Sequence, residues 1–464
     1  MSSKAYQAIS YQKRNILQSL IPKDWLLRPH SHPLPLDLRP LVSESNILTP
    51  TELSITSSHD ATSLSQLIPR ALDTEQRRTG KTRGPLHGIP VSLRDTFNIK
   101  GYDSSIGMTS LAEKPAQENT ALVDILLEQG AVLYCKTNIS QTLMALDSDN
   151  HIFGCVLNPR NTLVTAGGSS GGEGALLAMR DSVLGVGTDI GGSIRIPVMC
   201  NGLYSVSPSS QRVPFSGQEI GQLPGTEGIG LQASAGPIAT SVRDCELFLK
   251  TIADARAWEK DPKVAFGTWA SPGELWEKPL FGILRTDGIT TPLPPVGKGA
   301  FRHCQPLANA FFSIGGHNHT FDLLEETEES LIPWLSTRLK RRPPMDLSQV
   351  QDLHARKTGR MIDALICPVA PHPVPGIDRW NDYPAATLPV RDFTARDRED
   401  ELPPGLEILG GWDKRKKELW DLQTVDRTIY LNTKLSVQIV AHRLQERKLY
   451  EAMAYIDTLL KQAE

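Results

Sequence analysis

Short apolar runs alternate with amphipathic, helix-like stretches from residue 88 onward. The runs predict strands over residues 88–93, 131–135 and 183–186, and the stretches between them predict helices over 121–129 and 173–179. Gly130 stands where a helix C-terminal cap is expected. Strands that alternate with helices are typical of βαβ units, so the pattern predicts an α/β fold.

The same patterns extend toward both ends of the chain. Helices are predicted over the first 20 residues, over 241–253 and over 449–460, and strands over 364–367, 386–389 and 437–440. Ser241 and Asp244 resemble a capping box at the start of the second of these helices. The Pro-rich residues 30–40 predict an extended arm, the mixed charges of 391–401 a solvated loop, and the Gly- and Gln-rich residues 202–237 irregular chain near a functional site.

The chain contains no internal repeat and no low-complexity segment, which predicts one domain over residues 1–464. Within it we distinguish a helical and extended region (1–83), a core (84–244), and a remainder (245–464) that completes the sheet and covers the pocket. A hydrophobic share of 39% and a charged share of 22% are typical of a globular protein.

Charge and hydropathy exclude several partners. The 49 basic and 52 acidic residues give a formal net charge of −3, so we expect no nucleic-acid partner. Neither a membrane-spanning run nor a signal-peptide centre is apparent, so we expect no membrane contact and a cytoplasmic protein. A homodimer is compatible with the sequence.

Cysteine and histidine spacing gives no sign of a disulfide framework or a metal site. The six cysteines are scattered singly. His317 and His319, in a Gly-flanked segment, are interpreted as part of a polar loop. We therefore expect neither a metal nor another cofactor.

Two Gly-Ser clusters carry the candidate chemistry. Residues 166–174 read AGGSSGGEG and lead into a predicted helix, and residues 187–197 read GTDIGGSIRIP after a predicted strand. Glycines on both sides of serines let backbone N–H groups converge, which an oxyanion-stabilising loop requires. A phosphate-binding loop is not supported because no lysine follows either cluster, and Ile190 interrupts a dinucleotide fingerprint. Ser170, within Gly-x-Ser-x-Gly, fits the loose pattern of an esterase nucleophile elbow.

The two clusters, together with HGIPVSLRD at 87–95 and KTN at 136–138, resemble the amidase signature family. The resemblance is strongest over residues 84–244. The segments IPKDWLL at 21–27 and ESNILTPTELSIT at 44–56 are similar to its acetamidase-like branch. The resemblance implies one α/β/α domain around a mixed sheet and a Ser, cis-Ser, Lys triad that cleaves amides of small molecules through an acyl-enzyme.

Residue by residue, the resemblance assigns Ser193 as the nucleophile and Ser169 as the bridging serine that follows a cis peptide at Gly168. It assigns the oxyanion hole to the backbone N–H groups of Ile190, Gly191, Gly192 and Ser193. Ser170 and Asp189 are expected to hold the loops. The segments 55–84 and 326–363 are shorter than expected for the branch, which implies an altered pocket.

The sequence departs from the family at residue 94, where Arg94 stands in place of the catalytic lysine. A guanidinium stays protonated and cannot act as a general base. Loss of a general base typically lowers the rate by ~10²–10⁴-fold, so ordinary amidase activity is expected to be weak. Lys100 and Lys136 are predicted to be surface or structural lysines.

Four functions stay open at this point. The leading one is acyl transfer or carbonyl polarisation on a small molecule, retuned by Arg94. The others are a non-hydrolytic biosynthetic enzyme that cyclises or rearranges a substrate, a catalytically silent scaffold, and an esterase that uses Ser170.

Overall fold

The computed structural model describes residues 4–20, 76–223, 231–269, 282–283, 310, 312–356, 364–368, 384–400, 414, 417–418, 420–421, 426–431, 433–441 and 443–463. The expected extended arm at 30–40 and most of the segment 55–84 lie outside these residues.

Within the described residues, nine strands form one mixed sheet with the order β2-β1-β3-β5-β4-β8-β9-β7-β6. The strands are β1 (Pro90–Arg94), β2 (Val132–Thr137), β3 (Leu184–Asp189), β4 (Tyr204–Ser207), β5 (Ser234–Ala239), β6 (Gly282–Ile283), β7 (Ala364–Pro368), β8 (Ala385–Asp392) and β9 (Lys434–Ala441). β1 pairs in parallel with β2 and β3, and β6 pairs in parallel with β7, whereas the other pairs are antiparallel.

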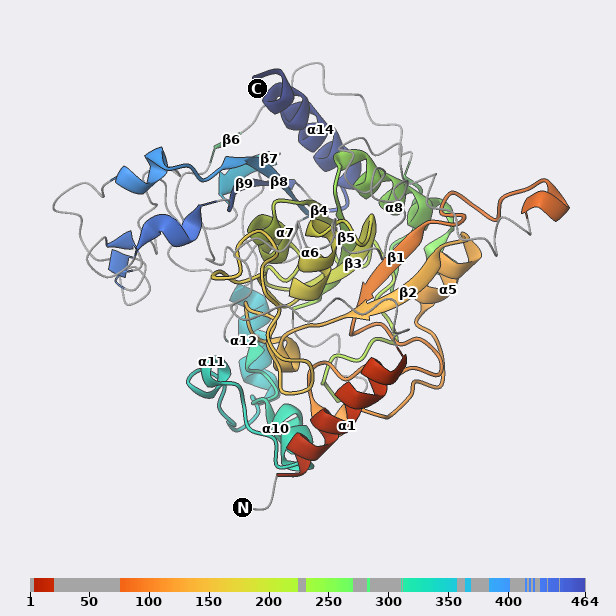
Figure 1. Cartoon of the computed structure of the whole chain (residues 1–464). Helices are drawn as coiled ribbons and strands as arrows, with labels where there is room; N and C mark the ends of the chain where they lie inside the picture. The colour runs from red at the N-terminus through yellow and green to blue at the C-terminus, as the bar shows by residue number, and fades with distance from the viewer. Residues whose placement is uncertain are drawn as a thin grey trace.

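Helices cover both faces of this sheet. The described helices are α1 (Ala5–Leu20), α5 (Ala121–Glu128), α6 (Gly171–Ala178), α7 (Arg195–Asn201), α8 (Val242–Asp254), α10 (Asn318–Glu325), α11 (Pro333–Ser336), α12 (Leu347–Arg356) and α14 (Glu446–Ala463). α8 and α14 contact each other and the central strands, and α6 and α7 form a second contacting pair (Figure 1). The fold is therefore the α/β architecture with a mixed sheet that the sequence predicts.

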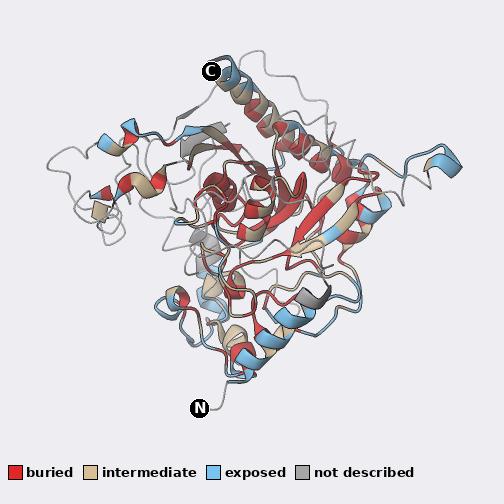
Figure 2. Ribbon diagram, viewed as in Figure 1, coloured by how far each residue is buried: buried red, intermediate tan, exposed pale blue. Residues whose placement is uncertain are grey.

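Alternation along the strands separates an apolar layer from a polar one. Val91 and Leu93 of β1 join the large apolar cluster that includes α8 and α14. Ser92 and Arg94 alternate with them and so face the opposite side, where Ser92 contacts α6. Figure 2 shows that the central strands and α6 and α7 are buried, whereas α1 and the end of α14 present exposed residues. Arg94 thus lies at the end of β1, the second strand from the edge of the sheet, and is buried inside the protein.

Most predicted elements exist, with boundaries shifted by a few residues. β1 extends to Arg94, and β3 extends to Asp189, so both strands end at site residues. Thr120 caps α5 through a hydrogen bond from Val123 N, and Ser241 caps α8 through one from Asp244 N. Gly130 follows α5 with φ +86°, as a C-terminal cap requires.

Three expectations about irregular chain were wrong. Residues 202–237 contain the buried strand β4 and most of β5, because small residues hide a strand pattern where chains pack closely: a Cβ on Gly236 would lie 2.2 Å from Val206 O. His317 and His319 are not both in a loop, since α10 begins at Asn318. Within 391–401, Arg391 and Asp392 form the end of β8 and pair with β9, and Arg391 forms a two-armed ion pair with Asp397 at 2.7 Å.

Candidate functional site

The first Gly-Ser cluster forms a tight loop before α6. The peptide between Gly168 and Ser169 is cis, as the resemblance implied. Ser148 closes the loop, because its hydroxyl donates to Gly167 O at 3.0 Å and accepts from Gly171 N at 2.8 Å. Gly167 has φ +81°, and a Cβ there would lie 2.8 Å from the backbone of Pro197. The glycine lets the first cluster approach the second.

The second cluster is organised by Asp189 at the end of β3. Its carboxylate accepts from Gly192 N at 2.7 Å and Ile194 N at 3.1 Å, and pairs with the Arg195 guanidinium at 3.0 Å. Burial alone would raise the pKa of Asp189, but the Arg195 charge and these hydrogen bonds hold that pKa below its usual value. Asp189 is therefore ionised and fixes the loop that carries Ser193.

Arg94 connects the two clusters. One terminal nitrogen donates to Ser170 Oγ at 2.8 Å and to Thr188 O at 2.9 Å, and the other donates to Ser169 Oγ at 3.0 Å. The side chain is only 1% exposed. No carboxylate forms an ion pair with it in the described part of the chain. Arg94 is thus a buried cation held mainly by neutral oxygens.

The electrostatics around Arg94 follow from its burial. Desolvation lowers the pKa of Arg94 to about 10, although the carboxylates of Asp189, Glu173 and Asp95 oppose this shift. Burial also raises the pKa of Glu173 to about 7, against the effect of hydrogen bonds from Ser92 and Thr137. Near neutral pH, Arg94 is charged, and burial keeps Glu173 protonated to a higher pH than an ordinary glutamate.

Ser169 and Ser193, the two serines that the resemblance assigns to catalysis, border a cavity of about 410 Å³. Its lining includes Arg94, Thr142, Ser169, Thr188, Ile190, Ser193, Gln211, Val213, Phe215, Gln218, Gln222, Gln232, Asp261, Lys263 and Phe312. Ser193 is 8% exposed, and apolar and polar groups share the wall. A volume of this size accommodates a small molecule.

The other predicted residues of the clusters flank this wall, and among them Gly191 is partly exposed. Ser170 is fully buried, and its backbone N–H donates to Ser193 O at 3.2 Å. Gly168, Ser170, Gly191 and Gly192 do not appear among the residues that line the cavity. Since the Gly192 amide is bound to Asp189, the candidates for oxyanion binding are the amides of Ile190, Gly191 and Ser193.

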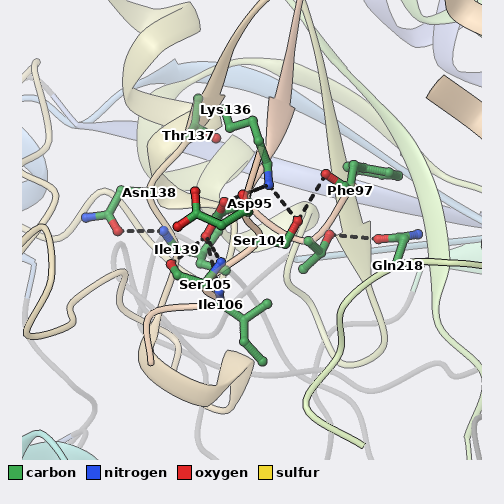
Figure 3. A network of polar contacts seen from close by, with 12 residues as sticks. Asp95, Phe97, Ser104, Ser105, Ile106, Lys136, Thr137, Asn138, Ile139 and Gln218 are labelled. Carbon is green, nitrogen blue, oxygen red and sulfur yellow. Dashed lines mark hydrogen bonds and ion pairs between the residues drawn. The ribbon is translucent and has the colours of Figure 1, made fainter. Parts of the chain in front are cut away.

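Lys136 belongs to a structural network on the strand beside β1. Its ammonium pairs with Asp95 at 2.9 Å and donates to Asp103 O at 2.7 Å and Ser104 Oγ at 2.6 Å (Figure 3). Lys100 is exposed. The structure therefore brings Arg94, Ser169, Ser170 and Ser193 together and keeps both lysines in the structural or surface roles that the sequence predicts.

Several cavity residues are missing from the sequence analysis. Gln211, Gln218 and Gln222 come from the irregular chain that was expected near a site, but nothing in the sequence singled them out. Thr142 lies in a short turn at φ +61°, which no periodicity signals. These residues come from segments that are far apart in the sequence, and only the fold brings them to one cavity.

The described residues contain neither a metal-binding cluster nor a membrane-spanning helix. His, Cys, Asp and Glu side chains there form no group of three that could hold a metal ion. None of the described helices has both the length and the apolar character that a bilayer crossing requires.

Comparison with known proteins gives the same picture. A family model described as Amidase matches residues 57–313. The acetamidase of Aspergillus oryzae is 28% identical and aligns with 99% of this chain and 100% of its own length. The acetamidase of Emericella nidulans is 30% identical over 82% of this chain and 78% of its own length.

A solved structure shares the fold. Fatty acid amide hydrolase superposes with a TM-score of 0.79 over 98% of this chain and 95% of its own, at 23% sequence identity. At that identity the match supports the α/β architecture and nothing finer.

Proposed function

Because this chain belongs to the amidase signature family, in its acetamidase-like branch, we propose that it is an acyl-transfer enzyme with slow amide hydrolysis. Family membership supports an amide hydrolase ancestry. The observation that carries the proposal is the contact of Arg94 with Ser169 and Ser170 beside the cavity that Ser193 lines.

The proposed nucleophile is the Ser193 hydroxyl. Its oxygen attacks the acyl carbon, the amides of Ile190, Gly191 and Ser193 hold the oxyanion, and the bond from carbon to the leaving group then breaks. The leaving group departs with the bonding electron pair. Water then attacks the acyl-enzyme and returns Ser193 to its hydroxyl form while releasing the carboxylic acid.

The slow step of the proposed reaction is removal of the proton from the Ser193 hydroxyl. Ser169 can accept that proton only if it passes its own proton onward. Its neighbour Arg94 already donates to it and, when charged, has no lone pair to receive a proton. The proton must leave through water in the cavity, so substrates with good leaving groups react and ordinary amides react slowly.

The fixed cation still contributes. Arg94 holds the Ser169 hydroxyl in one orientation and adds positive potential near the developing oxyanion. Activated esters, and amides that carry their own base, are the substrates that suit such a site.

A fluorophosphonate probe tests the nucleophile. We expect labelling of Ser193 in the intact protein and none in Ser193→Ala, with Ser170→Ala as the matched control that keeps its label. The buried position of Ser170 supports this expectation. Labelling that follows Ser170 would instead identify the esterase elbow, and no serine labelling would favour a silent scaffold.

A further inference from the structure

The cavity wall contains carboxamides whose orientation is fixed from behind. Thr96 is fully buried, and its hydroxyl donates to Gln218 Oε1 at 2.7 Å (Figure 3). Gln218 Nε2 lies on the other side, 3.4 Å from Phe215 O. If the amide were reversed, two carbonyl oxygens would face each other and the Thr96 proton would lose this acceptor. Because one N–H of Gln218 donates to Phe215 O, the second N–H is left to donate to a ligand.

The carboxamide of Gln211 is also held by its oxygen, as that of Gln218 is. The Arg443 guanidinium donates to Gln211 Oε1 at 3.0 Å. Because a guanidinium can only donate, this contact assigns the oxygen to Arg443 and leaves the amide nitrogen of Gln211 as the donor end. Both glutamines line the cavity.

Among the described residues that line the cavity, the single carboxylate already accepts a full set of hydrogen bonds. Asp261 Oδ2 accepts from Phe215 N at 3.1 Å and Ser216 N at 3.0 Å. Asp261 Oδ1 accepts from Ser216 Oγ at 2.9 Å and Lys263 N at 3.0 Å. Asp261 is 1% exposed. It holds the wall together and presents little acceptor capacity to a ligand.

The charges of the residues that line the cavity also favour an anionic ligand. Arg94 and Lys263 border the cavity as cations, whereas Asp261 is the only acidic residue among the lining residues of the described chain. A wall of N–H donors with an excess of positive charge matches an anionic acceptor group.

We propose that the cavity selects acyl compounds that carry a carboxylate at some distance from the scissile carbonyl, with Gln218 as a specificity-determining donor and Thr96 as its positioning residue. This inference rests on the proposed acyl-transfer function and names its substrate class. The carboxylate accepts from Gln218 Nε2 in the field of the two cations.

Three p-nitrophenyl esters of one chain length test the proposal. They end in a methyl, a carboxamide or a carboxylate group, and the chain is long enough to prevent cyclisation. We expect the wild type to hydrolyse the carboxylate ester with a kcat/KM roughly tenfold or more above that of the methyl ester, mainly through KM, because hydrogen bonds to charged groups are the stronger ones. The carboxamide ester separates the effect of a neutral acceptor from that of charge.

Variants assign the preference to its residue. Gln218→Met keeps the side-chain length and should abolish the preference, Gln218→Glu should reverse it, and Thr96→Val should weaken it. The matched control is Gln117→Met, because Gln117 is exposed and, among the described residues, its side chain bonds only Pro115 O, two residues earlier, at 3.1 Å.

The possible failures are distinguishable. Ser193-dependent turnover of all three esters at equal kcat/KM, or a preference that survives Gln218→Met, overturns the substrate class alone. Equal turnover in wild type and Ser193→Ala overturns the proposed function as well. Thermal melts of each variant confirm that the fold is intact when rates are compared.

Discussion

Replacement of Arg94 by lysine tests whether the guanidinium limits amide hydrolysis. Arg94 holds Ser169 and Ser170 with its two terminal nitrogens. A lysine ammonium also donates to several oxygens, but it can lose its proton and then accept one from a serine hydroxyl. Arg94→Lys therefore restores a proton acceptor while retaining a buried nitrogen near the same oxygens.

The expected size of the effect comes from the burial of residue 94. Burial lowers the pKa of Arg94 from 12.5 to about 10. The same depression applied to a lysine with an ordinary pKa of ~10.4 gives a pKa of ~8. At pH 7 the neutral fraction is then about 10% for lysine and about 0.1% for arginine, which is a hundredfold difference or ~2.7 kcal/mol of barrier.

The assay is release of p-nitroaniline from p-nitroacetanilide. We expect kcat/KM for Arg94→Lys to exceed that of the wild type by about a hundredfold at pH 7, within the range typical of general-base catalysis. The rate should rise with pH up to ~8 and then level off, because the lysine must be neutral to act. Arg94→Met serves as the matched control that removes the cation without supplying a base.

Two results would refute the reasoning. Equal rates for Arg94→Lys and Arg94→Met, with both proteins folded, would show that no proton acceptor is missing at residue 94. A gain that persists when Ser193→Ala is added would show that the new amine acts without the proposed nucleophile.

Two further predictions concern the groups around the site. Lys136→Met should lower the free energy of unfolding by ~3–5 kcal/mol, because it leaves the carboxylate of Asp95 without its ion-pair partner. Below its lowered melting temperature, the variant should still be labelled at Ser193 by the fluorophosphonate probe. Loss of labelling in the folded variant would mean that Lys136 takes part in the chemistry. Glu173 should make stability pH-dependent, because its pKa rises from 4.5 to about 7 on folding. The stabilisation that this raised pKa provides is fully present below pH ~4.5 and is lost as the pH rises through 7. The total loss is ~3 kcal/mol. Between pH 5 and 8, the Tm of Glu173→Gln should change less with pH than the Tm of the wild type. An identical dependence of Tm on pH in the two proteins would contradict the assignment.

The sequence was sufficient for the fold class because the apolar runs follow the strand and helix periods. It also predicted which serines and which cation would meet, because the two Gly-Ser clusters and residue 94 lie where strands end or α6 begins. Parallel pairing of β1 with β3 then brings these ends to one edge of the sheet.

The cavity wall could not be predicted in the same way. β5 reads SAGPIA, a composition typical of turns, yet it is fully buried at the centre of the sheet. The donor side of Gln218 depends on Thr96, which is 122 residues away in sequence. Such contacts depend on the register of the sheet and on loop paths, and no local pattern encodes them.

The charge balance behind the cavity links the proton on Glu173 to the base chemistry at residue 94. Asp189 is paired with Arg195 and Asp95 with Lys136, so Glu173 is the nearby carboxyl group without an ion-pair partner in the described chain. It stabilises positive charge at residue 94 only when it is ionised. In Arg94→Lys, a protonated Glu173 would therefore favour the neutral amine, and Glu173→Gln added to Arg94→Lys should shift the rate profile to lower pH. The buried acid is thus one of the groups, after burial itself and the charge of Asp189, that set the pH at which an amine in this position can act as a base.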